Sequence, residues 1–249
     1  DTLGSRSTAI GHSALITQNF TTATDSYNTA VGFYAGLSVT TGVYNTILGG
    51  LAGDALTDAD YNIALGYGAL GADTKGSRSI AIGAETLAAQ NFTTATNPHN
   101  IAIGHVAGND ITTGIENILI GGLAGDALTD ADSNVAVGKS ALSGDTLGSR
   151  STALGWSTLN AQNFTTATNT YNVAVGYQAG KSITTGLVNT LVGSLAGDAL
   201  TASSSNTAVG YSALTTDTLG TASVAIGAYA LQNQNFTTSL ASNNVAVGY

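Results

Sequence analysis

The fold of this chain is decided by a five-residue stretch, Asn28-Thr29-Ala30-Val31-Gly32. Pentapeptides of the same form, Asn or Ser followed by two variable residues, an aliphatic residue and glycine, end at Gly11, Gly32, Gly49, Gly66, Gly83, Gly104, Gly121, Gly138, Gly155, Gly176, Gly193, Gly210, Gly227 and Gly248. Successive glycines are 21, 17, 17 and 17 residues apart, so the whole pattern recurs every 72 residues. A short fixed period is typical of a solenoid, in which each repeat forms one coil and stacks on the next.

The pentapeptide itself has the character of a short β-strand. Its second and fourth residues are β-branched or aliphatic, as in Thr29 and Val31, and residues two apart point to the same face of a strand. The residue between them is usually alanine, but it is Ile47, Leu119 or Leu191 in the third coil of each period, so we expect the opposite face to be closely packed too. A helix is excluded because Gly, Asn and β-branched residues dominate and no 3.6-residue stripe persists.

We therefore predict an all-β protein, a parallel β-solenoid or β-roll of about 14 coils with a 17-residue coil and a 72-residue super-repeat. No linker or shift in composition interrupts it, so residues 1–249 are expected to form a single continuous array with super-repeats 1–72, 73–144 and 145–216 and a partial one at 217–249. The handedness of the coil and its number of strands stay open. One coil encloses few side chains, which favours association of several chains, and we expect a homotrimer.

Two recurring positions of the repeat carry structural expectations. Each motif glycine is expected where φ is positive or where another backbone comes close. The first motif residue is Asn in ten coils and Ser at Ser7, Ser79, Ser151 and Ser223. Stacked at a turn, these amides are expected to form a hydrogen-bonded ladder along the axis.

The composition excludes several classes of protein. The chain has 15 acidic and 6 basic residues, a net charge of −9, which would repel a phosphate backbone, so we expect no nucleic-acid partner. No apolar run approaches the ~20 residues of a membrane span. There is no cysteine, and His12, His99 and His105 share no metal-ligand spacing. Catalytic motifs are absent, and we predict neither an enzyme nor a cofactor.

The extra four residues of each period fall in the segment Gln18–Thr24 and its copies, which contain four of the five phenylalanines, Phe20, Phe92, Phe164 and Phe236. Two interpretations are open for these side chains. The favoured one is that each anchors a protruding loop to the coils; the other is that each is a knob, about 19 Å from the next, that touches a partner or glycan. Asn19, Asn91, Asn163 and Asn235 in the same segments also match the N-x-T sequon.

The residue after each motif glycine varies from Gly50 to Trp156, and such variation in size predicts a solvent-facing position. We name these fourteen residues the post-glycine column; its candidate surface contacts are Trp156, Tyr67, Tyr177 and Tyr211, whose rings could stack on sugars, although an ordinary decorated surface is the favoured interpretation. Asp54, Asp58 and Asp60 could hold Ca²⁺ through oxygen ligands. Solvated charges that protect an edge are the better explanation, because the third copy keeps only Asp198.

The segment Asn172-Val-Ala-Val-Gly-Tyr-Gln-Ala-Gly-Lys-Ser-Ile-Thr-Thr-Gly186 resembles repeats of bacteriophage tail-fibre and tail-spike proteins. It is also similar to the β-roll heads of YadA-like trimeric autotransporter adhesins, although their repeat is usually shorter. The resemblance implies an extracellular structural or adhesive shaft or head, most simply a phage tail fibre that contacts a host-surface glycan or receptor. The alternatives are a subunit of a self-assembling cellular filament, joined head to tail, or a bacterial adhesin. An ice-binding solenoid is disfavoured, since its threonine column would be interrupted by residues such as Ile63 and Ile80.

Overall fold

The computed structural model describes residues 1–249 and contains β-strands and turns but no helix. The chain divides into two compact units, Asp1–Gly122 and Leu123–Tyr249. Each unit is a parallel β-solenoid, and the two together contain the fourteen predicted coils. The predicted fold class is confirmed, and the boundary between the units falls inside the coil that begins at Asn117.

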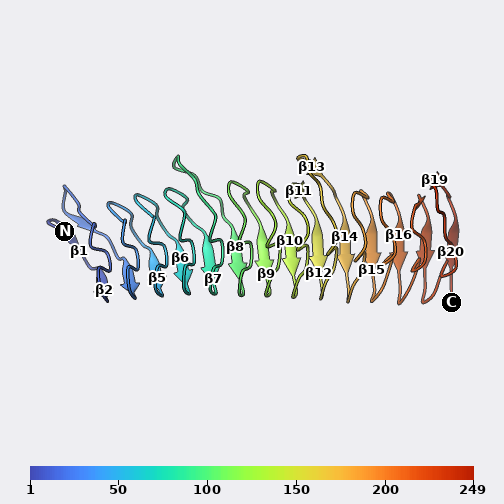
Figure 1. Cartoon of the computed structure of the whole chain (residues 1–249), viewed down its shortest axis with the longest axis horizontal. Coiled ribbons are helices and arrows are strands. Elements are labelled where there is room, and N and C mark those ends of the chain that lie inside the picture. Colours follow the sequence, from blue (N-terminus) through green and yellow to red (C-terminus); the bar gives the residue numbers. More distant parts are fainter. The chain divides into compact units, whose positions relative to one another are not determined.

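The motif strands of unit 1 pair in chain order, so that neighbours in sequence are neighbours in the sheet (Figure 1). All the pairs are parallel and in register, with Ala30 beside Ile47 and Ile47 beside Ala64. These three-residue strands are β2 (Thr8–Ile10), β4 (Thr29–Val31), β5 (Thr46–Leu48), β6 (Ile63–Leu65), β7 (Ile80–Ile82), β8 (Ile101–Ile103) and β9 (Ile118–Ile120).

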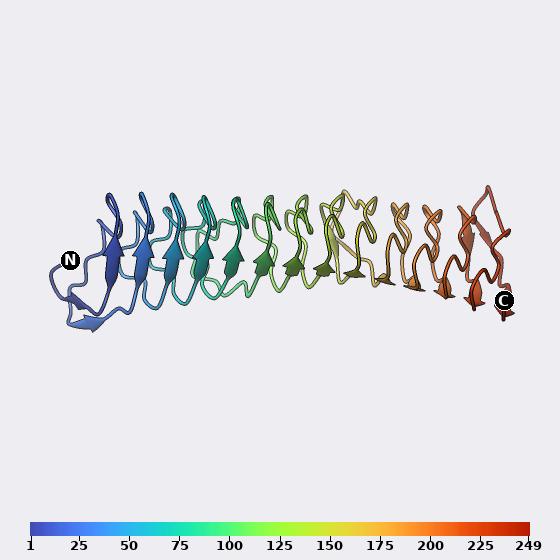
Figure 2. The same cartoon turned by 90° about the horizontal axis from the view of Figure 1, so that it is seen from below.

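Unit 2 repeats this arrangement, again with parallel pairing in chain order (Figure 2). Its three-residue strands are β10 (Val135–Val137), β12 (Thr152–Leu154), β14 (Val173–Val175), β15 (Thr190–Val192), β16 (Thr207–Val209), β18 (Val224–Ile226) and β20 (Val245–Val247). Each coil of either unit thus contributes one three-residue strand to this sheet.

The core of a coil is a thin stack of small and aliphatic side chains. In residues 45–61, the side chains of Ile47, Ala52, Leu56 and Ala59 are buried to 1% exposure or less. Glycine and leucine complement each other in volume at two positions of this coil. A Cβ on Gly53 would lie only 2.8 Å from Leu56 Cδ1, so the Leu56 side chain fills the space beside the glycine. In other coils a leucine replaces that glycine and a polar residue replaces Leu56, so the packed volume is retained.

The asparagines that begin the motifs point inward and form the predicted ladder. Asn45 Oδ1 accepts the backbone N–H of Asn62 at 2.9 Å, and Asn45 Nδ2 donates to the carbonyl of Ala59 in its own coil at 2.8 Å. Both asparagines are fully buried. The ladder therefore satisfies backbone groups at one corner of the coil that no strand reaches.

Left-handed backbone corners close each coil. In residues 45–61 these corners are Leu51, Gly53 and Tyr61, with φ of 57°, 50° and 58°. The motif glycine Gly49 is different: its φ is 134°, and a Cβ there would lie 2.5 Å from the carbonyl oxygen of Gly66 in the next coil. Both expectations for this position, positive φ and close backbone approach, are confirmed.

The longer coils project beyond their neighbours, as the loops near β13 and β19 show (Figure 1). In three of the four long coils a two-residue strand pairs with a strand of the coil before: β3 (Thr24–Asp25) with β1 (Gly4–Ser5), β13 (Thr168–Asn169) with β11 (Gly148–Ser149), and β19 (Leu240–Ala241) with β17 (Gly220–Thr221). In the remaining copy, Gly76 and Thr96 form an isolated parallel bridge.

Candidate functional site

The phenylalanines of the long coils lie inside the protein. Phe20, Phe92 and Phe164 are only 4%, 7% and 7% exposed, and Phe236, in the last coil of the sequence, is half-buried. This placement corrects the expectation that Phe20, Phe92 and Phe164 are surface contacts, because a buried ring cannot reach a partner or glycan. The other interpretation, a loop anchor, is confirmed for the three buried rings.

A buried polar network holds each anchor in place. Asp73 Oδ1 accepts the backbone N–H groups of Gly76 and Phe92 at 3.0 and 3.1 Å. Its Oδ2 accepts from Gln90 Nε2 at 2.5 Å, and Gln90 Oε1 accepts from Asn100 Nδ2 at 2.9 Å. Asp73, Gln90 and Asn100 are fully buried. The aspartate and the glutamine recur at the equivalent positions of every period, at Asp1, Asp145 and Asp217 and at Gln18, Gln162 and Gln234.

The aspartates weighed as a calcium site do not converge. Asp58 forms an ion pair with Lys75 at 3.8 Å, whereas Asp60 Oδ1 accepts the backbone N–H of Val43 at 2.8 Å. Partial burial raises the pKa of the Asp54 carboxyl, and a hydrogen bond to its own backbone N–H opposes that rise. No group of three His, Cys, Asp or Glu side chains in residues 1–249 is arranged to hold a metal ion.

The larger side chains of the post-glycine column are on the surface, as expected. Tyr67, Tyr177 and Tyr211 are 49–57% exposed, and Trp156 is 42% exposed. Trp156 and Tyr177 stack on each other, with ring centroids 5.1 Å apart. Tyr67 leans over Gly50, where an added Cβ would lie 3.7 Å from Tyr67 Cδ2, so its ring is flanked by a residue without a side chain.

A second aromatic column was not singled out from the sequence. It consists of the residue just before each motif, here called the pre-motif column, and in unit 1 it runs Arg6, Tyr27, Tyr44, Tyr61, Arg78, His99 and Glu116. All three arginines of the chain occupy this column, and each places its guanidinium 5.2–5.9 Å from a tyrosine ring centre: Arg6 on Tyr27, Arg78 on Tyr61 and Arg150 on Tyr171. The repeated Tyr or Arg one residue before the motif was the signal that could have revealed it.

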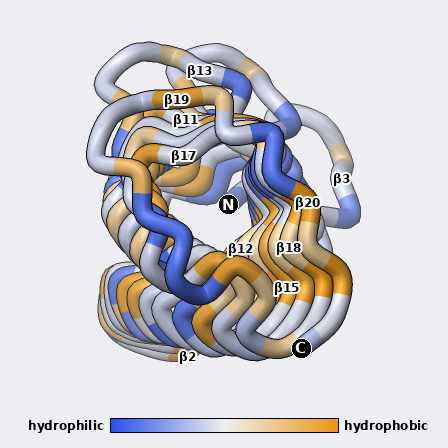
Figure 3. The backbone as a smooth tube through the Cα atoms, turned by 90° about the vertical axis from the view of Figure 1, so that its right-hand side faces the viewer, coloured by the Kyte–Doolittle hydropathy of each residue, from blue (hydrophilic) through white to orange (hydrophobic).

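Between the two columns lies the outer face of the strands, formed by the second and fourth motif residues. In contrast to the buried residue between them, these side chains are half-buried or exposed; Ile10, Leu48, Ile118 and Ile226 are 59%, 39%, 36% and 40% exposed. The fourth residue is aliphatic in every coil, and the second is Thr, Ile or Val. In unit 2 the strands β12, β15, β18 and β20 are coloured as one hydrophobic band in Figure 3.

No charged residue interrupts this outer face. The chain contains 21 charged residues, 15 acidic and 6 basic, and none of them falls within any of the fourteen pentapeptides. Depletion of charge together with exposed aliphatic side chains is the compositional signature of the centre of a protein–protein interface. The outer face is therefore the strongest candidate for a functional surface.

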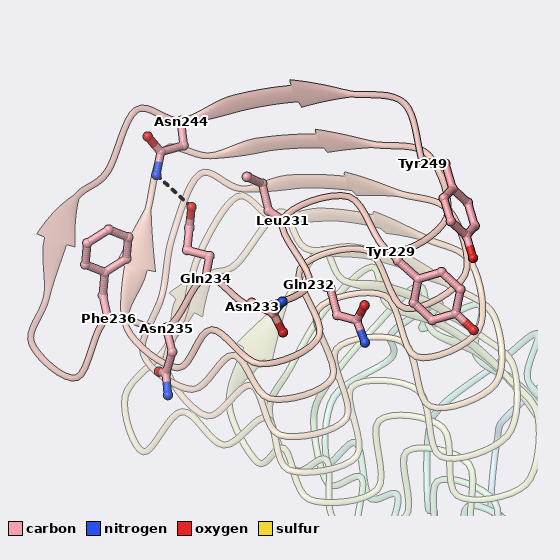
Figure 4. A pocket seen from close by; sticks show the side chains of 9 residues that line it. All are labelled: Tyr229, Leu231, Gln232, Asn233, Gln234, Asn235, Phe236, Asn244 and Tyr249. Carbon is pink, nitrogen blue, oxygen red and sulfur yellow. Dashed lines mark hydrogen bonds between the residues drawn. The ribbon is translucent and has the colours of Figure 1, made fainter.

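A hollow of about 830 Å³ lies at the last coil, lined by Tyr229, Leu231, Gln234, Phe236 and neighbours (Figure 4). Leu231 and Gln234 correspond to Leu159 and Gln162 one super-repeat earlier, which the following coil buries completely. The hollow thus occupies the place where another coil stacks in the rest of unit 2. We assign no ligand to it.

Comparisons of the chain with known proteins give no family model, curated protein or solved structure that matches it. No helix in the structure is long and apolar enough to cross a membrane. Function must therefore be inferred from the geometry of the coils.

Proposed function

We propose that this chain is the structural and adhesive shaft or head of an extracellular fibre, assembled from three copies, of the kind found in phage tail fibres. The observation that carries the proposal is the outer face of the strands: uncharged in every coil, and half-buried or exposed in the single chain. An exposed apolar surface costs free energy in water, and burying it against other copies recovers about 25 cal/mol per Å².

The outer face of the strands is long and narrow. Seven strands about 4.8 Å apart extend roughly 30 Å in each unit, and a three-residue strand spans about 10 Å. Each unit therefore offers on the order of 300 Å² on the strands themselves, to which the exposed side chains of the two flanking columns add, against about 800 Å² per partner in a standard interface. Exposed aromatic rings and arginines border the face, and these are the side chains enriched in protein interfaces.

Adhesion would follow from repetition. A trimer presents the same exposed residue several times at fixed spacing, and the second binding event then occurs at a high effective concentration. Tyr67 is the best candidate contact, because its ring is exposed and no bulky residue flanks it at Gly50. Trp156, Tyr177 and Tyr211 extend the same column, and a host-surface glycan is the proposed partner.

Substitution on the outer face tests the assembly. Ile82→Glu and Val209→Glu each place a carboxylate in the middle of the uncharged face, and we expect the particle to dissociate towards single chains in light scattering. Thr94→Glu, at an exposed position of a long coil, adds the same charge away from the face and is expected to leave the mass unchanged. If both face variants keep the mass of the wild type while remaining β-structured by circular dichroism, the proposed interface is wrong.

Binding of the purified particle to an array of cell-surface glycans tests the adhesive function separately. We expect Tyr67→Ala to weaken binding roughly tenfold, the effect of losing about 1.4 kcal/mol of contact energy. Thr94→Ala is the matched control. Binding of no glycan, together with open-ended assemblies in light scattering, would instead support a self-assembling cellular filament.

A further inference from the structure

Three tyrosines of the pre-motif column are stacked ring on ring along unit 1. The ring centroids of Tyr27 and Tyr44 are 5.2 Å apart with the planes at 12°, and those of Tyr44 and Tyr61 are 4.9 Å apart at 4°. The three side chains are 41%, 44% and 49% exposed. The phenol rings of neighbouring coils therefore lie face to face.

The backbone fixes this arrangement. Tyr27, Tyr44 and Tyr61 occupy left-handed corners with φ of 51°, 59° and 58°. The N–H groups of Tyr44 and Tyr61 each donate to the coil before, to Ser26 O at 2.8 Å and Val43 O at 3.0 Å.

Arginine closes both ends of the stack. Arg6 lies over the Tyr27 ring and donates to its hydroxyl, and Arg78 lies over the Tyr61 ring. The stack is therefore limited to three phenols.

The composition directs oxidation to these rings. Cysteine and methionine, the side chains that oxidants normally attack first, are both absent, whereas the chain has ten tyrosines and one tryptophan. An electron removed from this protein must come mainly from an aromatic side chain. Among the tyrosines, those of the stack lie closest to parallel partners of their own kind.

We propose that the stack Tyr27–Tyr44–Tyr61 is a site of oxidative cross-linking that joins adjacent coils as dityrosine. Each of two neighbouring phenols loses one electron and one proton, and the resulting radicals form a carbon–carbon bond between the ring positions next to the hydroxyls. Each ring then regains its aromaticity by moving the hydrogen of that carbon to its oxygen. The two electrons pass to a one-electron oxidant, such as a photogenerated ruthenium(III) complex; persulfate, which becomes two sulfate ions, accepts both in the net reaction.

The product would close a 17-residue loop covalently, from Tyr27 to Tyr44 or from Tyr44 to Tyr61. A cross-link of this kind restricts the unfolded chain as a disulfide does. It would give durability to a protein without cysteine. The stacked rings would react in this way whether or not the protein is a fibre.

The test is photo-oxidation of the purified native protein with the ruthenium complex and persulfate. We expect dityrosine fluorescence, a mass loss of two hydrogens per link, and a proteolytic fragment that joins Tyr44 to Tyr27 or Tyr61. Tyr44→Phe keeps the middle ring but removes its phenol, and it should lower the yield several-fold with an unchanged melting temperature. Tyr171→Phe, at an exposed tyrosine of the same column but outside the stack, should leave the yield unchanged.

Two results would overturn the proposal. One is an equal dityrosine yield in wild type and Tyr44→Phe. The other is a set of links confined to different tyrosines, such as Tyr211, Tyr229 and Tyr249, whose rings meet edge-on at 81–83°.

Discussion

Asn45 accepts the backbone N–H of Asn62 through its side-chain oxygen, one coil away, at 2.9 Å. The same relation recurs from Asn62 to Ser79, from Asn100 to Asn117 and from Asn172 to Asn189. One buried amide thus ties its own coil to the next, and stability passes from neighbour to neighbour as in other solenoids.

Removal of one asparagine from the ladder should lower the stability of the fold. In Asn62→Ala, the N–H of Ser79 and the carbonyl of Gly76 lose their partners while remaining buried, and we expect the free energy of unfolding to fall by about 2–4 kcal/mol. Urea unfolding followed by circular dichroism measures the change. Asn97→Ala, at an exposed asparagine, should change it by no more than about 0.5 kcal/mol.

Substitution by alanine should lower the stability at Gly49 but not at the adjacent Gly50. A Cβ at Gly49 would lie 2.5 Å from the Gly66 carbonyl oxygen, on a backbone with φ of 134°, so Gly49→Ala should destabilise by about 3 kcal/mol or more. At Gly50 the nearest atom lies at 3.7 Å, an ordinary contact, and Gly50→Ala should be nearly neutral. Similar melting temperatures for the two variants would contradict the stacking of coils through the motif glycines.

Relief of backbone strain should raise stability at Val188. This β-branched residue has a φ of 58° and is 53% exposed, so little packing is lost when it is replaced. Asparagine tolerates left-handed backbone, and Val188→Asn should stabilise by up to about 1 kcal/mol in thermal unfolding. Val192→Asn, in the extended strand β15, is the control and should destabilise; a loss of stability in both variants would refute the strain at Val188.

The pH dependence at Asp54 has a defined sign. Burial raises the pKa of its carboxyl above the ordinary 3.8, so the folded state binds the proton more tightly than the unfolded state does. The contribution of Asp54 to the free energy of unfolding is therefore most favourable below pH 3.8, and it is lost as the pH rises through the pKa of the folded state. Asp54→Asn should melt at a higher temperature than wild type at pH 7, and the difference should shrink at pH 3. A difference independent of pH would exclude this cause.

The coils could be predicted from the sequence because the residues that each coil needs lie close together in the chain and recur in every repeat. Glycine recurs at the position of Gly49 in every coil, which predicted a close approach to the next backbone. Asparagine or serine recurs at the position of Asn45, which predicted a stacked ladder. The post-glycine residues Tyr67 and Trp156 were found because only a surface position tolerates such variation. For Phe20 the sequence left a loop anchor and a surface contact both open. The hydrogen bonds that accompany its burial, from Gln18 Nε2 and the Phe20 N–H to Asp1, join residues of different coils and appear only when the coils stack.

The outer face of the strands escaped recognition for a related reason. The pattern of Thr29, Ala30 and Val31 gives two faces but does not say which one encloses the core. The structure places Ala30 inside and leaves Thr29 and Val31 partly exposed. Charge supplies the missing signal, because all charges avoid the pentapeptides, a property visible only after the coils are aligned.

The mass of the native particle in solution tests the central claim most directly. Multi-angle light scattering of the wild type should give a discrete species of about 74 kDa, three times the 24.7 kDa of one chain, that persists on dilution. A stable particle of 24.7 kDa would contradict the account, because the uncharged outer face would then remain in water without a partner.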